Sequence, residues 1–305
     1  MLFPVLLILF LFPAAAFSQG IQERVDIDIV NVYLSATDSE QRFVTDLKPG
    51  EIILKEDGAI QKIEHFTNLA LEPGRSLGEK GVPLTVAFVI DISNSMNATI
   101  HGQTKIDIVK SAALRLLDEL RAEDKMTLIA FGETATQVTP LTSDKKPFEQ
   151  ELLFQGVELQ NTALLDAVYF AMEKLKQEFG RKIIVVCSDG EDTASYLRFD
   201  EVLSNLVASD ITVLAFGTMA LTSSSLKGHY ILERLAQASG GYAFFPTSMS
   251  MLERMMEKLR QGMRSQYSLG YRPGKKMDGT WRKIEIRCTR PGLKLRYREG
   301  YHAKK

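Results

Sequence analysis

Between residues 84 and 264, short apolar runs alternate with amphipathic helical patterns, and this alternation restricts the fold more than any other feature of the chain. The predicted buried strands cover residues 84–90, 126–131, 182–187, 211–216 and 242–245. The predicted helices cover residues 105–121, 164–179, 199–208, 231–238 and 251–264. Alternation sustained over this length predicts an α/β fold with a doubly wound, mostly parallel sheet and helices on both of its faces.

The chain is β-rich on both sides of this region, at residues 23–70 and 266–302. Asp57-Gly58 favours a tight hairpin turn between strands near 51–55 and 59–66, because both residues tolerate a positive φ. Short β segments with unpaired edges are marginal alone, so we expect the two segments to pack together as one small β-sandwich. The predicted domains are an N-terminal β segment with its linker at 19–80, the α/β domain at 82–264, and a C-terminal β segment at 265–305.

The first residues have the features of an export signal. Residues 1–22 contain no charged side chain, and the apolar run at 2–12 is shorter than the roughly 20 residues that cross a bilayer. Ala16-Phe17-Ser18 allows cleavage before Gln19, so we predict a signal peptide at 1–18 and a secreted or periplasmic protein with no membrane span after cleavage. No Lys or Arg precedes the apolar run, although signal peptides usually have a positively charged start. An uncleaved membrane anchor is the alternative.

Composition excludes several classes of protein. The 305 residues include 37 Lys and Arg against 38 Asp and Glu, so the net charge of −1 gives no general reason to bind nucleic acid or an anionic membrane. The two cysteines, Cys187 and Cys288, have no CxxC neighbours, which excludes a thiolate metal site or a disulfide scaffold. We expect two free thiols, with a disulfide between them as the alternative in an oxidising compartment.

The segment DISNS at 91–95 directly follows the first predicted parallel strand and supplies Asp91, Ser93 and Ser95. Ligands of open α/β sheets bind at the carboxyl ends of strands, and carboxylate and hydroxyl oxygens suit Mg²⁺, Mn²⁺ or Ca²⁺. The same residue types also cap turns and helices, so this motif alone does not distinguish a metal site from a capped turn.

Two other kinds of site do not match the motif. A calcium EF-hand is excluded, since Met96 and Gly102 stand where that loop needs Gly and Glu. A DxDxT phosphatase would need a second carboxylate at Ser93.

Two further junctions between a strand and a helix add oxygen donors. Thr162 stands just before the predicted helix 164–179, where its ordinary role would be to cap that helix. Asp189 follows the strand 182–187 in a Ser-Asp-Gly turn, which could be only a turn.

These three segments together resemble a known site. DISNS at 91–95, NTALLDA at 161–167 and VVCSDGEDT at 185–193 resemble, in this order, the metal-ion-dependent adhesion site of the von Willebrand factor type A (VWA) domain. The resemblance covers roughly residues 82–262, and it implies the metal ligands Asp91, Ser93, Ser95, Thr162 and Asp189. The flanking segments VDIDIVNVYLSATD, YSLGYRPG, WRKIEIRC and LKLRYREGY further resemble a VWFA-related family of exported bacterial proteins.

The resemblance implies a non-enzymatic, adhesion-type binding protein that holds one divalent cation, Mg²⁺ first, with Mn²⁺ or Ca²⁺ as alternatives. In the family, one coordination position stays open for an Asp or Glu of a protein partner. A VWA subunit of a metal-insertion or chaperone-like machine is the first alternative, and the export signal argues against it. A metallohydrolase is the second; it would need a positioned base, and the four histidines show no metal-ligand spacing.

Overall fold

The computed structural model describes residues 29–69, 83–100, 102–158, 161–217, 223–246 and 267–303, together with Met251, Arg254 and Lys258. The strands are β1 (Val30–Thr37), β2 (Ile52–Glu56), β3 (Ala59–Gln61), β4 (Ile63–Asn68), β5 (Leu84–Asp91), β6 (Thr99–Ile100), β7 (Gln103–Thr104), β8 (Lys125–Phe131), β9 (Ala135–Gln137), β10 (Arg181–Ser188), β11 (Ile211–Gly217), β12 (Tyr242–Phe244), β13 (Tyr267–Tyr271), β14 (Trp281–Cys288), β15 (Lys294–Arg296) and β16 (Gly300–His302). The helices are α1 (Lys105–Asp118), α2 (Lys145–Phe154), α3 (Leu164–Leu175), α4 (Phe199–Ala208) and α5 (Ser223–Ala238), with 3-10 turns η1 (Pro49–Glu51) and η3 (Asn94–Asn97).

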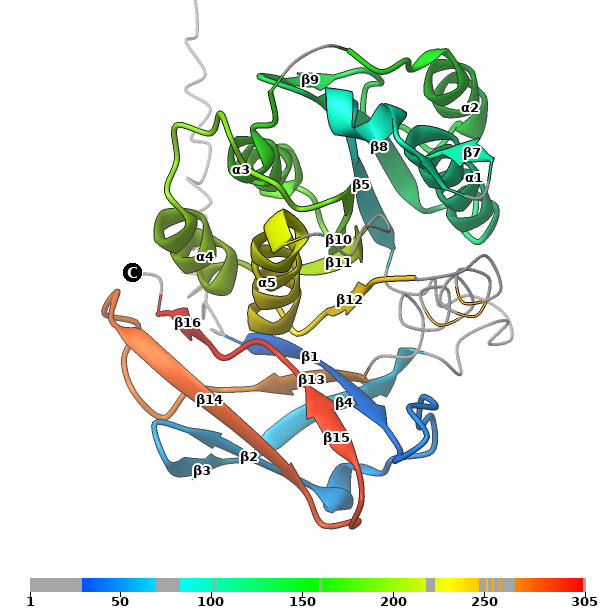
Figure 1. Ribbon diagram of the computed structural model, residues 1–305. Helices are drawn as coiled ribbons and strands as arrows, with labels where there is room; N and C mark the ends of the chain where they lie inside the picture. The colour runs from blue at the N-terminus through cyan, green and yellow to red at the C-terminus, as the bar shows by residue number, and fades with distance from the viewer. Residues whose placement is uncertain are drawn as a thin grey trace, which may run out of the picture.

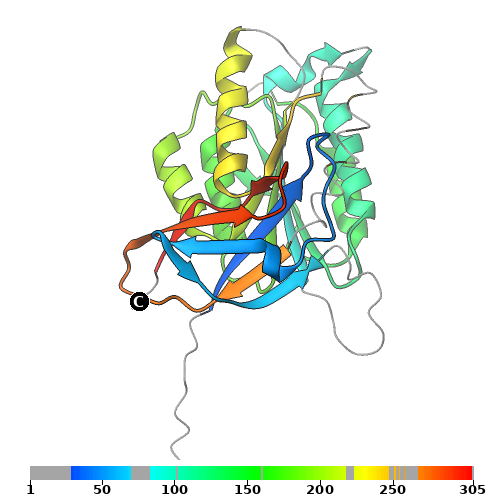
Figure 2. The ribbon, with the colours of Figure 1, turned by 90° about the horizontal axis from the view of Figure 1, so that it is seen from below.

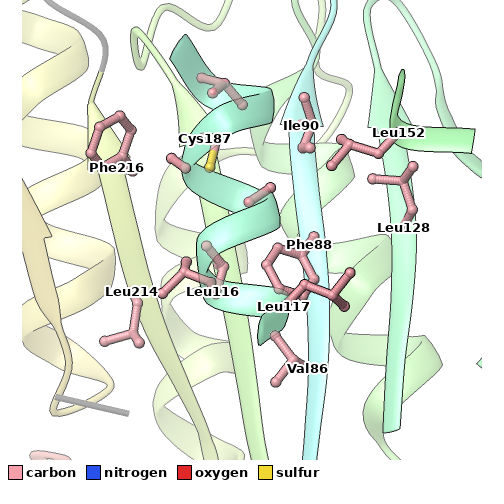
Figure 3. Close-up of a cluster of buried hydrophobic side chains, with 14 of the residues drawn as sticks. Val86, Phe88, Ile90, Leu116, Leu117, Leu128, Leu152, Cys187, Leu214 and Phe216 are labelled. Carbon is pink, nitrogen blue, oxygen red and sulfur yellow. The ribbon is translucent and has the colours of Figure 1, made fainter. Parts of the chain in front are cut away.

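The centre of the α/β part is a six-stranded sheet in the order β12-β11-β10-β5-β8-β9, parallel except for the edge strand β9. Strand β5 is buried along its whole length because helices cover both faces of the sheet. Its alternate residues Val86, Phe88 and Ile90 pack under α1 and α2 in the cluster that Figure 3 shows. Ala87 and Val89 pack under α3, α4 and α5 on the opposite face. Figures 1 and 2 show these two helical layers on either side of the sheet. The predicted doubly wound fold is confirmed.

The two chain ends form the predicted sandwich below the α/β part in Figure 1. One sheet has the order β15-β1-β13-β4, and the other has the order β16-β14-β2-β3, so each sheet contains strands from both ends of the chain. Their facing apolar side chains form a separate core that includes Leu34, Leu54, Leu269 and Ile286. Asp57 and Gly58 have φ values of 47° and 84°, which gives the predicted hairpin turn.

The sandwich contacts the α/β part at the amino ends of the parallel strands. The Ser35 hydroxyl lies 2.8 Å from the hydroxyl of Tyr242, which begins β12. The Arg296 guanidinium lies over the ring of Tyr242, 4.6 Å from its centroid, and donates to the Gly241 carbonyl. Arg298 donates to the Ser209 carbonyl, just before β11. The carboxyl ends of the same strands therefore point away from the sandwich.

Several predicted elements differ from the structure. The predicted strand 59–66 is divided at Lys62: β3 pairs with β2 in one sheet and β4 pairs with β13 in the other. Helix α5 begins at Ser223, eight residues before its predicted start, and helix α2 and strands β9 and β16 were not predicted. The two cysteines are free thiols, as expected.

The predicted signal peptide at 1–18 lies outside the described residues, as do most of the linker and most of the predicted helix 251–264. The domain boundaries near 80 and 264 therefore stay predictions. None of the helices in the described ranges is both long and apolar enough to cross a membrane.

Candidate metal centre

The first loop of the candidate site begins at the carboxyl end of β5, in the middle of the parallel sheet. Asp91 is fully buried, and its Oδ1 accepts the backbone N–H of Ser93 at 2.9 Å. Its Oδ2 accepts the hydroxyl of Ser188, the last residue of β10, at 2.6 Å. Because β5 and β10 are adjacent and parallel, their ends bring the first and third loops together.

Ser93 and Ser95 follow on the short turn η3, and their hydroxyl oxygens lie 3.3 Å apart. Two neighbouring oxygen ligands of an octahedral Mg²⁺ are about 3 Å apart, since each lies about 2.1 Å from the ion. Ser93 is the N-cap residue of η3 but makes no side-chain capping bond. The two hydroxyls are hydrogen-bonded to each other, and Ser93 also bonds the carboxylate of Asp91. Their spacing is one that a shared cation would also allow, and a side-chain cap of η3 does not account for Ser93.

The second loop places Thr162, which is buried, just before α3. The N-cap residue of α3 is Ala163, and the N–H of Leu165 donates to the Ser195 hydroxyl at 3.0 Å and to Asp192 Oδ1 at 3.3 Å. Thr162 is therefore not the helix cap that its position suggested. Its N–H donates to the Thr193 hydroxyl at 3.0 Å and its carbonyl accepts the Thr193 N–H at 2.8 Å, which attaches the second loop to the third.

The third loop places Asp189 directly after β10. Its Oδ1 accepts the N–H of Glu191 at 3.3 Å, and its side chain is buried. Gly190 has a φ of 82°, and a Cβ there would collide with the carbonyl of Gly228 on α5. Only glycine fits at this position, so α5 packs directly against the loop that carries Asp189.

Lys105 is the charged residue of this site that the sequence reasoning missed. It is the first residue of α1, and its Nζ donates to Asp189 Oδ2 at 3.1 Å, with both side chains 6% exposed. The two residues are 84 positions apart, so no local pattern shows the contact. The sequence offers one sign of it: Lys105 directly follows the polar loop at 97–104, which comes after the DISNS motif.

The burial of Asp91 favours a positive charge beside its carboxylate. Burial raises the pKa of Asp91 to about 6, and the charge of Asp189 adds to the rise, while hydrogen bonds from Ser188 and Ser93 oppose it. An ionised Asp91 is therefore costly until a positive charge approaches it.

The donor set fits a small, hard cation: two carboxylates and three hydroxyls on three loops that are hydrogen-bonded to one another. In the described ranges there is no group of three or more His, Cys, Asp or Glu that could hold a metal ion. A cation at this edge of the sheet would therefore depend on the hydroxyl oxygens as well as on the carboxylates.

Comparison with known proteins agrees with the fold. Residues 86–191 match the family model described as von Willebrand factor type A domain. Inter-alpha-trypsin inhibitor heavy chain H2 of Sus scrofa is 27% identical over 155 residues, which is 45% of this chain and 16% of that protein. Heavy chain H4 of Bos taurus is 31% identical over 179 residues, 53% of this chain and 18% of that protein. The chain thus spans less than a fifth of the length of these relatives.

Two solved structures share the fold. Proximal thread matrix protein 1 from the mussel byssus, with a zinc-occupied MIDAS motif, has a TM-score of 0.52 and 20% identity, over 64% of this chain and 48% of that one. The PilB minor pilin of Streptococcus sanguinis has a TM-score of 0.50 and 12% identity, over 63% of each chain. The family model and these folds support a VWA domain here. Such domains typically mediate protein interactions, often bind a divalent metal, and are generally not enzymes.

Proposed function

We propose that this protein is an exported, non-enzymatic binding module that captures an acidic side chain of a protein partner through a divalent cation. Asp91, Ser93, Ser95, Thr162 and Asp189 would hold the ion, with Mg²⁺ as the first candidate. The observation that carries the proposal is the pair of serine hydroxyls, 3.3 Å apart, beside a buried carboxylate with a raised pKa.

The chemistry of the donors supports the choice of partner. Two carboxylates would neutralise a divalent ion, and neutral hydroxyls would fill further positions without adding charge. The ammonium of Lys105 beside Asp189 would then leave the site with one positive charge, which would attract one more anionic oxygen from outside the protein. An Asp or Glu side chain of another protein is the simplest source, and the typical role of VWA domains in protein interactions favours that source over a free anion.

Export is proposed from the sequence alone, through the predicted signal peptide at 1–18. The two alternatives are a subunit of a metal-insertion or chaperone-like machine and a metallohydrolase. No observation on the described residues favours either of them. Fractionation of cells and turnover assays would separate these three functions.

The test is a titration of Mg²⁺ and Mn²⁺ into the full chain, followed by thermal unfolding. An ion at 100 times its Kd stabilises the folded state by about 2.7 kcal/mol, so the wild type should gain several degrees in Tm. Asp91→Ala should show no gain. Asp200→Ala is the matched control, because it removes an exposed carboxylate on α4 and should respond like the wild type.

A capture experiment tests the partner. An extracellular or periplasmic extract should yield a partner that EDTA releases and that Asp91→Ala fails to retain. Equal metal responses of wild type and Asp91→Ala would refute the site, and capture that resists EDTA would place the binding surface elsewhere.

A further inference from the structure

Lys105 occupies a position that is unfavourable for its own helix. It is the first residue of α1, where the positive end of the helix dipole repels an ammonium group. Thr104 already caps this helix, since its hydroxyl accepts the N–H of Asp107 at 3.2 Å. The lysine therefore contributes nothing to the start of α1 that another residue would not provide better.

Lys105 is also buried, which is rare for lysine unless its charge is paired. Its partner is Asp189 Oδ2, at 3.1 Å. Buried ion pairs of this kind often stabilise a fold no better than apolar side chains of similar size. The stability of the fold therefore does not account for a lysine at this position. Its positive charge next to Asp189 needs another explanation.

The charges of the site can be counted. Asp91 and Asp189 contribute two negative charges, Lys105 contributes one positive charge, and the serine and threonine hydroxyls are neutral. A divalent ion would bring the sum to one positive charge, and one carboxylate from outside would bring it to zero. Without Lys105, the ion alone would already neutralise the two aspartates, and an outside carboxylate would add an uncompensated negative charge.

We propose that Lys105 is a specificity-determining residue that weakens the binding of the cation alone and makes that binding depend on an anionic ligand. The inference rests on the proposed function, and it adds a coupling: the cation and the carboxylate each raise the affinity of the site for the other. In the absence of a cation, Lys105 holds the carboxylate of Asp189 in place. Once the ion is bound, the same positive charge favours an acidic ligand over a neutral one.

Three variants separate the charge of Lys105 from its other contributions. Lys105→Met keeps the length of the side chain and removes the charge, Lys105→Gln keeps a hydrogen-bond donor without charge, and Lys105→Arg keeps the charge. Lys110→Met removes a lysine charge from a different position on the same helix and is the control for general charge effects.

The experiment measures the affinity of the full chain for Mn²⁺ by calorimetry, in sodium chloride and in sodium acetate at equal ionic strength. Lys105→Met and Lys105→Gln should bind Mn²⁺ roughly tenfold more tightly than the wild type in chloride, because a nearby positive charge has been removed. Acetate should raise the Mn²⁺ affinity of the wild type, Lys105→Arg and Lys110→Met, and it should have little effect on the two uncharged variants at position 105.

Two results would overturn the inference. If both uncharged variants bind Mn²⁺ no more tightly than the wild type and respond equally to acetate, Lys105 is only a structural partner of Asp189. The proposed site would still stand, provided that Asp91→Ala abolishes Mn²⁺ binding. If Asp91→Ala binds Mn²⁺ like the wild type, the site and the inference fail together. Should Lys105→Met not fold, Lys105→Gln decides.

Discussion

The protein buries carboxylates in two regions, the sandwich core and the carboxyl edge of the parallel sheet, and surrounds them differently. In the sandwich, Glu56 is 1% exposed, and its Oε2 accepts the hydroxyls of Tyr271 and Tyr301, both at 2.7 Å. All three residues are on strands, which belong to both sheets. At the sheet edge, the partners of Asp91 and Asp189 include loop N–H groups, a serine hydroxyl and the Lys105 ammonium.

The difference shows that burial of a carboxylate does not by itself indicate a functional site. Burial and the bond to Glu56 raise the pKa of Tyr271 and of Tyr301, so both remain neutral donors fixed by the strands. This arrangement ties the two sheets together. The aspartates of the candidate metal centre are instead bound by loop N–H groups, a serine hydroxyl and the Lys105 ammonium, and serine hydroxyls that could also bind a metal ion lie beside Asp91.

The largest effect is expected at Glu56. Glu56→Ala would leave two buried tyrosine hydroxyls without their acceptor and open a small cavity, and it should cost about 3–5 kcal/mol in urea unfolding. Glu56→Gln keeps an acceptor and should cost much less. Both variants, where folded, should keep the Mn²⁺ response of the wild type. A loss below about 1 kcal/mol for Glu56→Ala would contradict a structural role.

The second effect is a pH dependence at Asp91, measured in EDTA. The folded-state pKa of about 6 lies above the ordinary value of 3.8, so the folded state binds the proton more tightly than the unfolded state. The stabilisation from that proton is complete below about pH 4 and is lost as the pH rises through 6, by roughly 3 kcal/mol at pH 7. Asp91→Asn, which does not titrate, should lack this loss.

Urea unfolding of wild type and Asp91→Asn at pH 4, 5, 6 and 7 gives the comparison directly. Parallel stability curves would show that Asp91 has no raised pKa. Mg²⁺ at pH 7 should restore stability to the wild type only, because the ion compensates the buried charge.

The smallest effect is expected at Ser188, whose hydroxyl donates to Asp91 Oδ2 and accepts the N–H of Gly190. Ser188→Ala should cost about 1–2 kcal/mol at pH 7. Its cost should shrink at pH 4, where Asp91 is protonated. A cost that is equal at the two pH values would mean that the hydroxyl supports the turn at Gly190 rather than the carboxylate.

The sequence was most informative where a pattern repeats. The parallel strands were predicted closely, because runs such as residues 84–90 are buried on both faces and therefore uniformly apolar. Helix α2 was missed, because it buries only Phe148 and Leu152 while its neighbours Leu153 and Phe154 are exposed. The start of α5 was missed because its first turns are rich in serine and contain Gly228, which is required by contact with Gly190.

For the candidate site, the motifs supplied all five proposed ligands, since each follows a predicted strand or precedes a predicted helix. Lys105 and Glu56 could not be found in this way. Their partners are 84 and more than 200 residues distant in the chain, so only the folded structure brings these charges together.

The sandwich and the candidate metal centre lie at opposite ends of the parallel strands. Both ends of the described chain, Ile29 and Ala303, lie in or next to sandwich strands, at the amino ends of the parallel strands, while the candidate metal centre lies at their carboxyl ends. An attachment to a bead or a sensor surface made directly at Ile29 or Ala303 would therefore leave the candidate metal centre facing the solution. A partner presented on a second, opposing surface would then meet the carboxyl edge of the parallel sheet before it met the sandwich.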